Sequence, residues 1–211
     1  ASLVAAPIGA AASAVGDFVK WATVLQPFFM GILVSVIVGV ALTLPISSAA
    51  ICAALGLTGL AGGAAVAGCC AQMVGFAVMS FRENGWGGLV AQGVGTSMLQ
   101  MPNIVKNPRI WIPPTLASAI TGPLATCLFH LEMNGTAVSS GMGTCGFVGQ
   151  IGVYTGWIND IANGAKTAIT AMDWTGMALI CFVLPAVLSW VFCLILRKWG
   201  WIGENDLKLE L

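Results

Sequence analysis

The chain has 211 residues, of which 58% are hydrophobic and 8% are charged, and its formal net charge is zero. A water-soluble domain carries about 25% charged residues. The composition therefore argues against an ordinary soluble protein, and the lack of a basic patch argues against nucleic-acid binding. No charged residue or histidine occurs from Trp21 to Phe81. A helix needs about 20 apolar residues to cross a bilayer, so we expect a polytopic membrane protein.

The backbone chemistry of membranes restricts the fold class. In hydrocarbon, unpaired N–H and C=O groups are costly, so only helices and closed barrels span a bilayer. Barrel strands alternate apolar and polar residues, and the run 28-FFMGILVSVIVGVAL-42 does not alternate. The sequence predicts an all-α helical bundle that forms a single transmembrane domain over residues 1–211.

The N-terminal stretch 3–16 is small and apolar, and Asp17 and Lys20 mark an interface after it. We interpret it as the end of a helix or as a surface helix. No basic region precedes it, so a cleavable signal is not expected. Because the chain begins with Ala, we expect an N-terminal portion to precede it.

The first clear span is expected over about residues 24–44, with Pro27 in its first turn, where a missing N–H is harmless. Pro45 ends it, and Ser47 or Ser48 is placed to cap the next helix. The stretch 56–65 is a predicted break because of its glycines.

A second span is expected from about residue 60 to Phe81, and its many small residues favour close helix packing. The next apolar segment, 86–105, contains four glycines and Pro102. These residues make it a poor lipid-facing helix and favour a re-entrant hairpin or a broken helix.

A kinked span with three prolines is expected from about residue 110 to 131, followed by a second interrupted segment, 135–158, which has seven glycines and no charge. The last span is predicted over about residues 174–196, with a kink at Pro185. Arg197 and Lys198 follow it and favour a cytoplasmic C-terminus. Residues 199–211 are expected to be a short soluble tail.

The two interrupted segments share a motif. The first contains 93-GVGTS-97 and the second contains 141-GMGTC-145, and each is followed by a glutamine. This indicates either an internal repeat or a chance match in a glycine-rich chain. A repeat would pair two broken segments near the middle of the membrane, where transporters bind solutes.

The run 141-GMGTCG-146 also fits G-x-G-x-x-G, the spacing of a dinucleotide-binding loop. That loop needs a preceding strand and an acidic residue about 20 positions later. No strand pattern precedes Gly141, and the next acid is Asp160. We therefore reject nucleotide binding.

Candidate solute-binding residues lie in or near both segments. Their polar groups could hydrogen-bond a solute, or they could satisfy broken backbone and neighbouring helices. For Gln72, inside the second span, packing and solute binding are equally good interpretations. The candidates are Ser97, Gln100, Asn103, Gly143, Thr144, Gln150 and Gln72.

Three ionisable residues form a second group of candidates. His130 and Glu132 could couple transport to protons, or they could face water at an interface. Arg109 could bind a phosphate or carboxylate, or it could extend to lipid headgroups. No cofactor or metal site is expected, because the seven cysteines lie in apolar surroundings without a C-x-x-C pair.

Several long stretches resemble one known family. They are 94-VGTSMLQMPNIVKNPRIWIPPTLASAITGPLAT-126, 43-TLPISSAAI-51, 69-CCAQMVGFAVMSFRENG-85, 141-GMGTCGFVGQIG-152 and the closing GWIGENDLKLEL. The chain resembles phosphotransferase-system sugar permeases (enzyme IIC), in the divergent branch that includes perfringolysin-O-regulator-like membrane proteins. The resemblance covers essentially the whole chain and implies that this sequence corresponds to the C-terminal two-thirds of a longer permease-like domain.

The resemblance implies a multi-pass permease of the bacterial cytoplasmic membrane that dimerises and moves a sugar-like solute. Phosphorylation of the solute would come from a separate IIB protein, because this chain has no soluble IIA or IIB module. The better-known permeases carry a membrane-embedded His and Glu near the sugar, whereas His130 and Glu132 lie at a predicted span end. The alternative function is therefore a membrane sensor or regulator that has the permease fold but no net transport.

Overall fold

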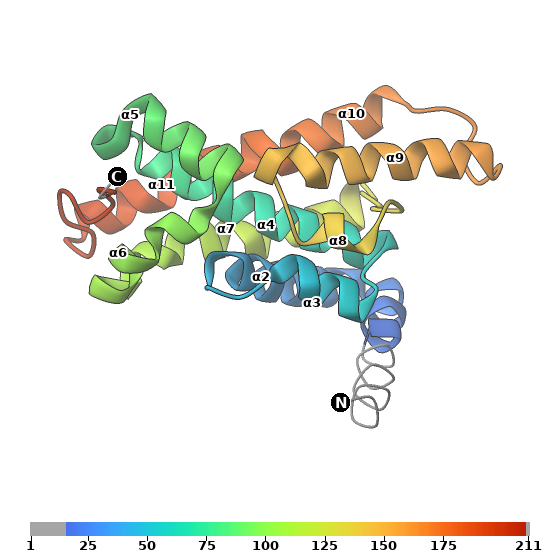
Figure 1. The fold of residues 1–211 in the computed structure, drawn as a ribbon, viewed down its shortest axis with the longest axis horizontal. Helices are drawn as coiled ribbons and strands as arrows, with labels where there is room; N and C mark the ends of the chain where they lie inside the picture. Colours follow the sequence, from blue (N-terminus) through green and yellow to red (C-terminus); the bar gives the residue numbers. More distant parts are fainter. Residues whose placement is uncertain (1–15, 210–211) are drawn as a thin grey trace.

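The computed structural model describes residues 16–209, and this part of the chain consists of helices and turns with one isolated β-bridge, between Gly59 and Met133. Many of the helices lie side by side along the long axis of the molecule (Figure 1). The all-α prediction is confirmed. Two helices, Gly59–Met79 and Ala171–Lys198, are long and apolar enough to cross a membrane, and Pro27–Thr43 is a shorter apolar helix. Most of the stretch 3–16 lies outside the described residues.

Helix α4 (Gly59–Met79) occupies the centre and is buried along nearly its whole length. Its glycines explain how other segments approach it so closely. A Cβ on Gly68 would lie 1.9 Å from the carbonyl oxygen of Ser35 in α2 (Pro27–Thr43), and one on Gly63 would lie 1.6 Å from that of Leu131. The predicted packing through small residues is therefore confirmed.

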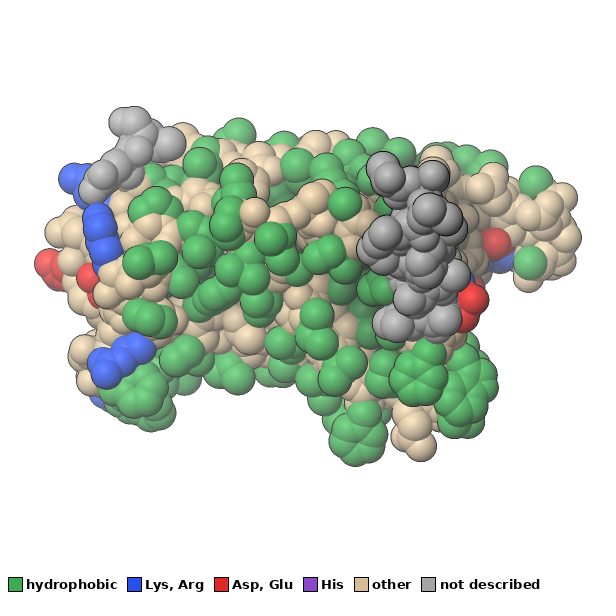
Figure 2. Space-filling model, turned by 60° about the horizontal axis from the view of Figure 1, so that its bottom comes forward, with side chains coloured by type: hydrophobic (Ala, Val, Ile, Leu, Met, Phe, Trp, Pro, Cys, Tyr) green, Lys and Arg blue, Asp and Glu red, His purple; other side chains and the backbone are tan. Residues whose placement is uncertain are grey.

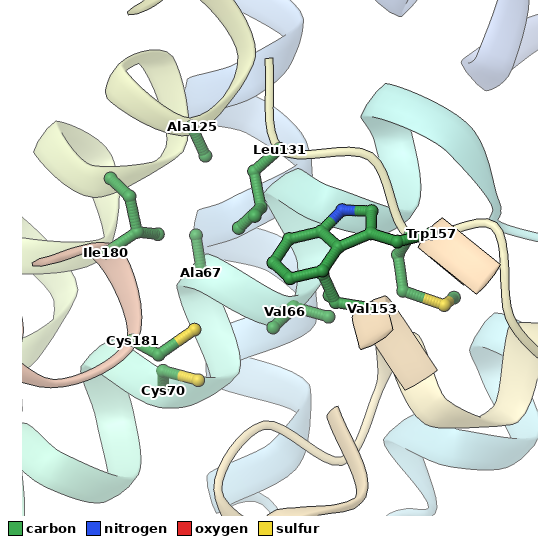
Figure 3. Packing of buried hydrophobic residues seen from close by; sticks show 10 residues of the cluster. Val66, Ala67, Cys70, Ala125, Leu131, Val153, Trp157, Ile180 and Cys181 are labelled. Carbon is green, nitrogen blue, oxygen red and sulfur yellow. The ribbon is translucent and has the colours of Figure 1, made fainter. Parts of the chain in front are cut away.

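A hydrophobic cluster joins α4 to three other segments (Figure 3). Val66 and Ala67 of α4 belong to one buried cluster with Ala125, Trp157 and Ile180. Trp157 is the largest side chain of the cluster, and it supplies much of the apolar area that is buried there. The second half of the chain is thus packed against the central helix.

The residues at the two ends of α3 (Ser48–Leu55) explain why this helix begins and ends where it does. The Ser47 hydroxyl accepts a hydrogen bond from the Ala50 N–H at 3.1 Å, which is the predicted cap. Gly56, with φ of 58°, ends α3 in the left-handed conformation. Because α4 already begins at Gly59, the break predicted over 56–65 is confined to its first residues.

Two later apolar helices contain π-helical turns next to prolines. Helix α7 (Ile112–Pro123) continues into the π-turn η4 (Leu124–Leu128). Helix α10 (Ala171–Ala178) continues through the π-turn η6 (Leu179–Val183) into α11 (Leu184–Lys198), just before Pro185. Such turns accommodate backbone groups that a proline leaves without their usual helical partner.

The charged residues gather at the two ends of the long axis, and on the face shown in Figure 2 hydrophobic side chains lie between them. The end where α4 and α11 finish, called the C-terminal end, carries Arg82, Glu83, Lys106, Arg109, Arg197, Lys198, Glu204, Asp206 and Lys208. The opposite end carries Asp17, Lys20, His130, Glu132, Asp160, Lys166 and Asp173. The 28-residue helix from Ala171 to Lys198 connects the two ends, and at 1.5 Å per residue it is about 42 Å long.

The first hairpin spans residues 81–106 and starts at the C-terminal end. Helix α5 (Phe81–Val90) and the π-turn η1 (Ala91–Gly95) run inward, and the chain reverses at Thr96. The 3-10 turn η2 (Ser97–Gln100) and helix α6 (Met101–Lys106) return. Asn107 then contacts the C-terminal residues Trp201 and Asp206, so both arms of the hairpin finish at the same end.

The second hairpin spans residues 137–162 and starts at the opposite end. Its short helix α8 (Ala137–Ser140) leads into a turn that contains the 3-10 turn η5 (Cys145–Phe147). Helix α9 (Val148–Ala162) returns, and Asp160 near its end accepts a hydrogen bond from Asn134, which precedes α8. The two hairpins therefore point toward each other from opposite ends of the molecule.

Candidate functional site

The tips of the two hairpins touch beside the middle of α4. The Thr144 hydroxyl donates a hydrogen bond to the carbonyl oxygen of Gly93, so the two G-x-G-T motifs are in direct contact. Thr144 also lies 3.6 Å from the sulfur of Met73 in α4. The motifs are 48 positions apart in sequence, and the fold brings them together at one buried place.

Gly143 explains how the second tip reaches α4. Its φ is 52°, in the left-handed region, and a Cβ there would lie 2.7 Å from the Cβ of Cys69. Glycine is therefore required both by the turn and by the close approach of the two backbones. Its role in the structure is to position Thr144 against the first tip.

A buried polar network connects the first tip to the central helices. The hydroxyls of Ser97 and Thr43 share a 2.8 Å hydrogen bond. Gln72 accepts hydrogen bonds from Thr43 at 3.3 Å and from the Trp111 indole at 3.0 Å, and its amide donates to Thr115 at 3.3 Å. Gln72 thus joins α2, α4 and α7. This arrangement is what the packing interpretation of Gln72 describes.

Gln150 follows the second tip and is the least satisfied polar side chain near it. Its amide nitrogen lies 3.2 Å from the Cys70 sulfur, which is a weak acceptor. Its Oε1 is buried and has no hydrogen-bond partner among the described residues. Since a buried carbonyl without a donor costs free energy, this oxygen is available to a ligand that carries a donor.

Gln100 and Asn103 hold the C-terminal segment instead of facing Thr144. The Gln100 amide donates to Gln92 at 2.8 Å and to the Leu207 carbonyl at 3.0 Å. The Asn103 amide donates to Gln100 at 2.9 Å and to the Lys208 carbonyl at 2.9 Å. These two candidates therefore lie on the arm of the first hairpin that faces the C-terminal end.

The segment expected to be a soluble tail is packed against the first hairpin. Leu207 is fully buried, and Ile202 is nearly so. The Asn84 side chain donates to the Leu207 carbonyl and accepts from the Leu209 N–H, both at 2.8 Å. Asparagine and glutamine side chains of the hairpin thus bind the backbone of residues 201–209.

The ionisable candidates lie away from the tips. His130 and Glu132 are exposed at the opposite end, beside a cavity of about 310 Å³ that Trp157 and Lys166 also line. Arg109 lies at the C-terminal end, with its guanidinium 5.2 Å from the centre of the Trp201 ring.

Three features of the interior were not singled out from the sequence. Thr43 and Trp111 complete the Gln72 network, and Glu83 forms a largely buried ion pair with Arg197. A hydroxyl at the end of an apolar helix, such as that of Thr43, gives only a weak signal in the sequence. Glu83 belongs to a charged cluster that sequence reasoning assigns to a helix end.

No group of three or more His, Cys, Asp or Glu residues that could hold a metal ion exists within residues 16–209. The seven cysteines are all free. The tips contain hydroxyls, amides and backbone groups, which suit a neutral polar solute better than a metal or an anion.

Comparison with known proteins gives one family. A family model described as "Phosphotransferase system, EIIC" matches residues 1–209. No curated protein and no solved structure matches the chain.

Proposed function

The chain belongs to the phosphotransferase-system EIIC family, and we propose that it binds a small polar solute, such as a sugar, between the tips of its two hairpins. Family membership makes it a permease-like membrane protein with a sugar substrate. The observation that carries the proposal is the contact of the two G-x-G-T motifs, together with the unpaired oxygen of Gln150, six residues after Thr144.

In this conformation the tips are closed, because Ser97 and Thr144 are buried and hydrogen-bonded. We infer that a solute enters when the tips separate. Its hydroxyls would then replace the Thr144–Gly93 and Ser97–Thr43 hydrogen bonds and donate to Oε1 of Gln150. A sugar hydroxyl both donates and accepts, which fits this mixed set of groups.

The distribution of charge supports an orientation in the membrane. Six of the eight basic residues lie at the C-terminal end, and basic residues are enriched on the cytoplasmic side. We propose that this end and the C-terminus are cytoplasmic in a bacterial inner membrane. The first hairpin is then re-entrant from the cytoplasm and the second from the outside.

We propose that any phosphoryl transfer to the solute requires a separate IIB-type protein at the cytoplasmic end. The described residues offer no nucleophile–base pair at the tips, so this chain by itself would supply binding and passage.

A homodimer would cover part of its exposed apolar faces, such as that of α9 with Ile151 and Ile158.

Sugar binding to purified protein in nanodiscs tests the site. Gln150→Leu keeps the approximate size of the side chain but removes its acceptor, so we expect it to abolish binding in calorimetric titrations with a sugar panel. Gln26→Leu is the matched control, since it makes the same change at an exposed position. Unchanged binding by Gln150→Leu would remove Gln150 from the site.

A sensor without net transport is the second candidate. It is favoured by the placement of His130 and Glu132, the residue types that better-known permeases carry near the sugar, at the exposed opposite end. Flux of the bound sugar into liposomes separates the two functions. Binding without flux, in the presence of phosphotransferase components, would identify a sensor.

A further inference from the structure

A groove between α5 and α11 lies outside the hairpin tips and has two chemically different parts. The apolar part has a volume of about 300 Å³ and is lined by Val78, Trp86, Leu89, Trp190 and Leu194, among others. Trp86 and Trp190 are strongly exposed at its rim. Tryptophan is typical of the boundary between lipid tails and headgroups.

The polar part adjoins the apolar part at the C-terminal end. Arg82 and Arg197 line both parts, and Glu83, Glu204, Asn205 and Lys208 complete a second cavity of about 270 Å³. The groove is therefore amphipathic along its length: it changes from tryptophan and leucine side chains to a pocket of charged side chains.

The charges of this pocket leave two cations available. Arg197 is paired with Glu83 and also donates to the Cys193 sulfur at 3.4 Å. Arg82 and Lys208 are both exposed, and neither forms an ion pair with another described residue. With Glu204 as the remaining acid, the unpaired groups carry a net charge of one positive unit.

We propose that this groove binds one anionic phospholipid, with an acyl chain in the apolar part and the phosphate at Arg82 and Lys208. A phosphodiester carries one negative charge and several acceptor oxygens, which match the free guanidinium and ammonium groups. Basic pockets between membrane helices on the cytoplasmic side are suited to such headgroups. The lipid would connect the first hairpin to α11.

Native mass spectrometry of the purified full chain in a neutral detergent tests the proposal. Phosphatidylglycerol is compared with phosphatidylcholine of the same acyl composition, and we expect clearly tighter binding of phosphatidylglycerol. Removing one cation with Arg82→Gln should weaken that binding about fivefold, the effect of losing one basic side chain near a lipid surface. Leu194→Trp should block the apolar part and weaken binding of both lipids.

Lys198→Gln is the matched control. It removes an exposed positive charge at the same end of the molecule but outside both cavities, so the preference for phosphatidylglycerol should not change. Equal binding of the two lipids by the unmodified chain would overturn the proposal without reference to any variant. A loss of preference in Lys198→Gln equal to that in Arg82→Gln would also overturn it, because it would indicate non-specific charge attraction.

Two further measurements distinguish other occupants. Glycerol 3-phosphate offers the phosphate without an acyl chain, and we expect millimolar amounts not to displace the lipid. Displacement would indicate an anion site and contradict the lipid proposal. If Leu194→Trp instead converts dimers to monomers and leaves lipid binding intact, the groove is an interface between two copies of the chain, and the proposal fails.

Discussion

At the scale of single residues, Gln100 and Gln150 show how one residue type takes two roles. Each follows a G-x-G-T motif, so sequence reasoning treats them alike. In the structure Gln100 donates to Gln92 and Leu207 and accepts from Asn103, whereas Gln150 has only a sulfur contact. The first therefore contributes to stability, and the second is free to serve a ligand.

The two glutamines should consequently differ in their effect on stability. Gln100→Leu leaves buried partners without hydrogen bonds, and we expect it to lower the free energy of unfolding by about 1–3 kcal/mol. Gln150→Leu should be nearly neutral, because its lost contacts are weak. Reversible unfolding in mixed micelles measures both, and equal losses would contradict the roles assigned to the two side chains.

Gly68 lies where α2 and α4 approach each other closely at the backbone of Ser35. An added Cβ would meet the Ser35 backbone at 1.9 Å, so Gly68→Ala must push α2 away from α4. We expect this to cost about 3 kcal/mol, the upper part of the usual range for overpacking. Gly87→Ala is the control, since nothing lies within 4 Å of its Cβ position. Unfolding midpoints in the same detergent compare the two variants, and similar midpoints would contradict close α2–α4 contact.

At the scale of elements, the C-terminal segment 201–209 and the first hairpin form one unit. The segment has no regular secondary structure of its own, and its backbone is held by asparagine and glutamine side chains of α5, η2 and α6. Leu207 anchors it in a cluster with Phe76, Ile104 and Leu196. Ordering of this segment and of the hairpin should therefore be coupled.

Leu207→Ala tests this coupling. Truncating a fully buried leucine costs about 2–5 kcal/mol, and here we expect the loss to be local, with faster amide hydrogen exchange in residues 97–106. Val105→Ala, at an exposed position in the same hairpin, should leave exchange unchanged. If Leu207→Ala accelerates exchange uniformly over the chain, the segment is part of the global core and does not form a unit with the hairpin.

At the scale of the whole molecule, the arrangement of charge indicates how the protein sits in a bilayer. On the face shown in Figure 2, charged side chains gather at the two ends and hydrophobic side chains cover much of the surface between them. The two hairpins start at opposite ends and meet near the middle of α4. Any movement that separates the tips would therefore open a path at the centre of the molecule.

The proposed orientation gives a labelling experiment. In intact cells, Ala165→Cys should react with a membrane-impermeant maleimide, because the opposite end would face outside. Asn205→Cys should react only after the membrane is permeabilised. Both variants are made in a chain with Cys127 and Cys145 replaced by Ser, since the other native cysteines are buried. The reverse labelling pattern would invert the orientation.

The sequence by itself determined that the chain is too apolar for an ordinary soluble domain and that it forms helices. A run without charge from Trp21 to Phe81 predicts apolar helices, the cap at Ser47 follows from local chemistry, and glycines predict where helices pack closely. These conclusions depend on composition and on residues a few positions apart, which local physics governs.

Only the tertiary structure decided which polar side chains face each other. Thr144 bonds to Gly93, Gln72 to Trp111, and Gln100 to Leu207, across 51, 39 and 107 positions of the chain. The repeated G-x-G-T motif indicated at most that the two segments pair, and the individual partners come from packing around α4. This is why the tips form a candidate site while Gln100 and Asn103, from the same motif region, hold the C-terminal segment.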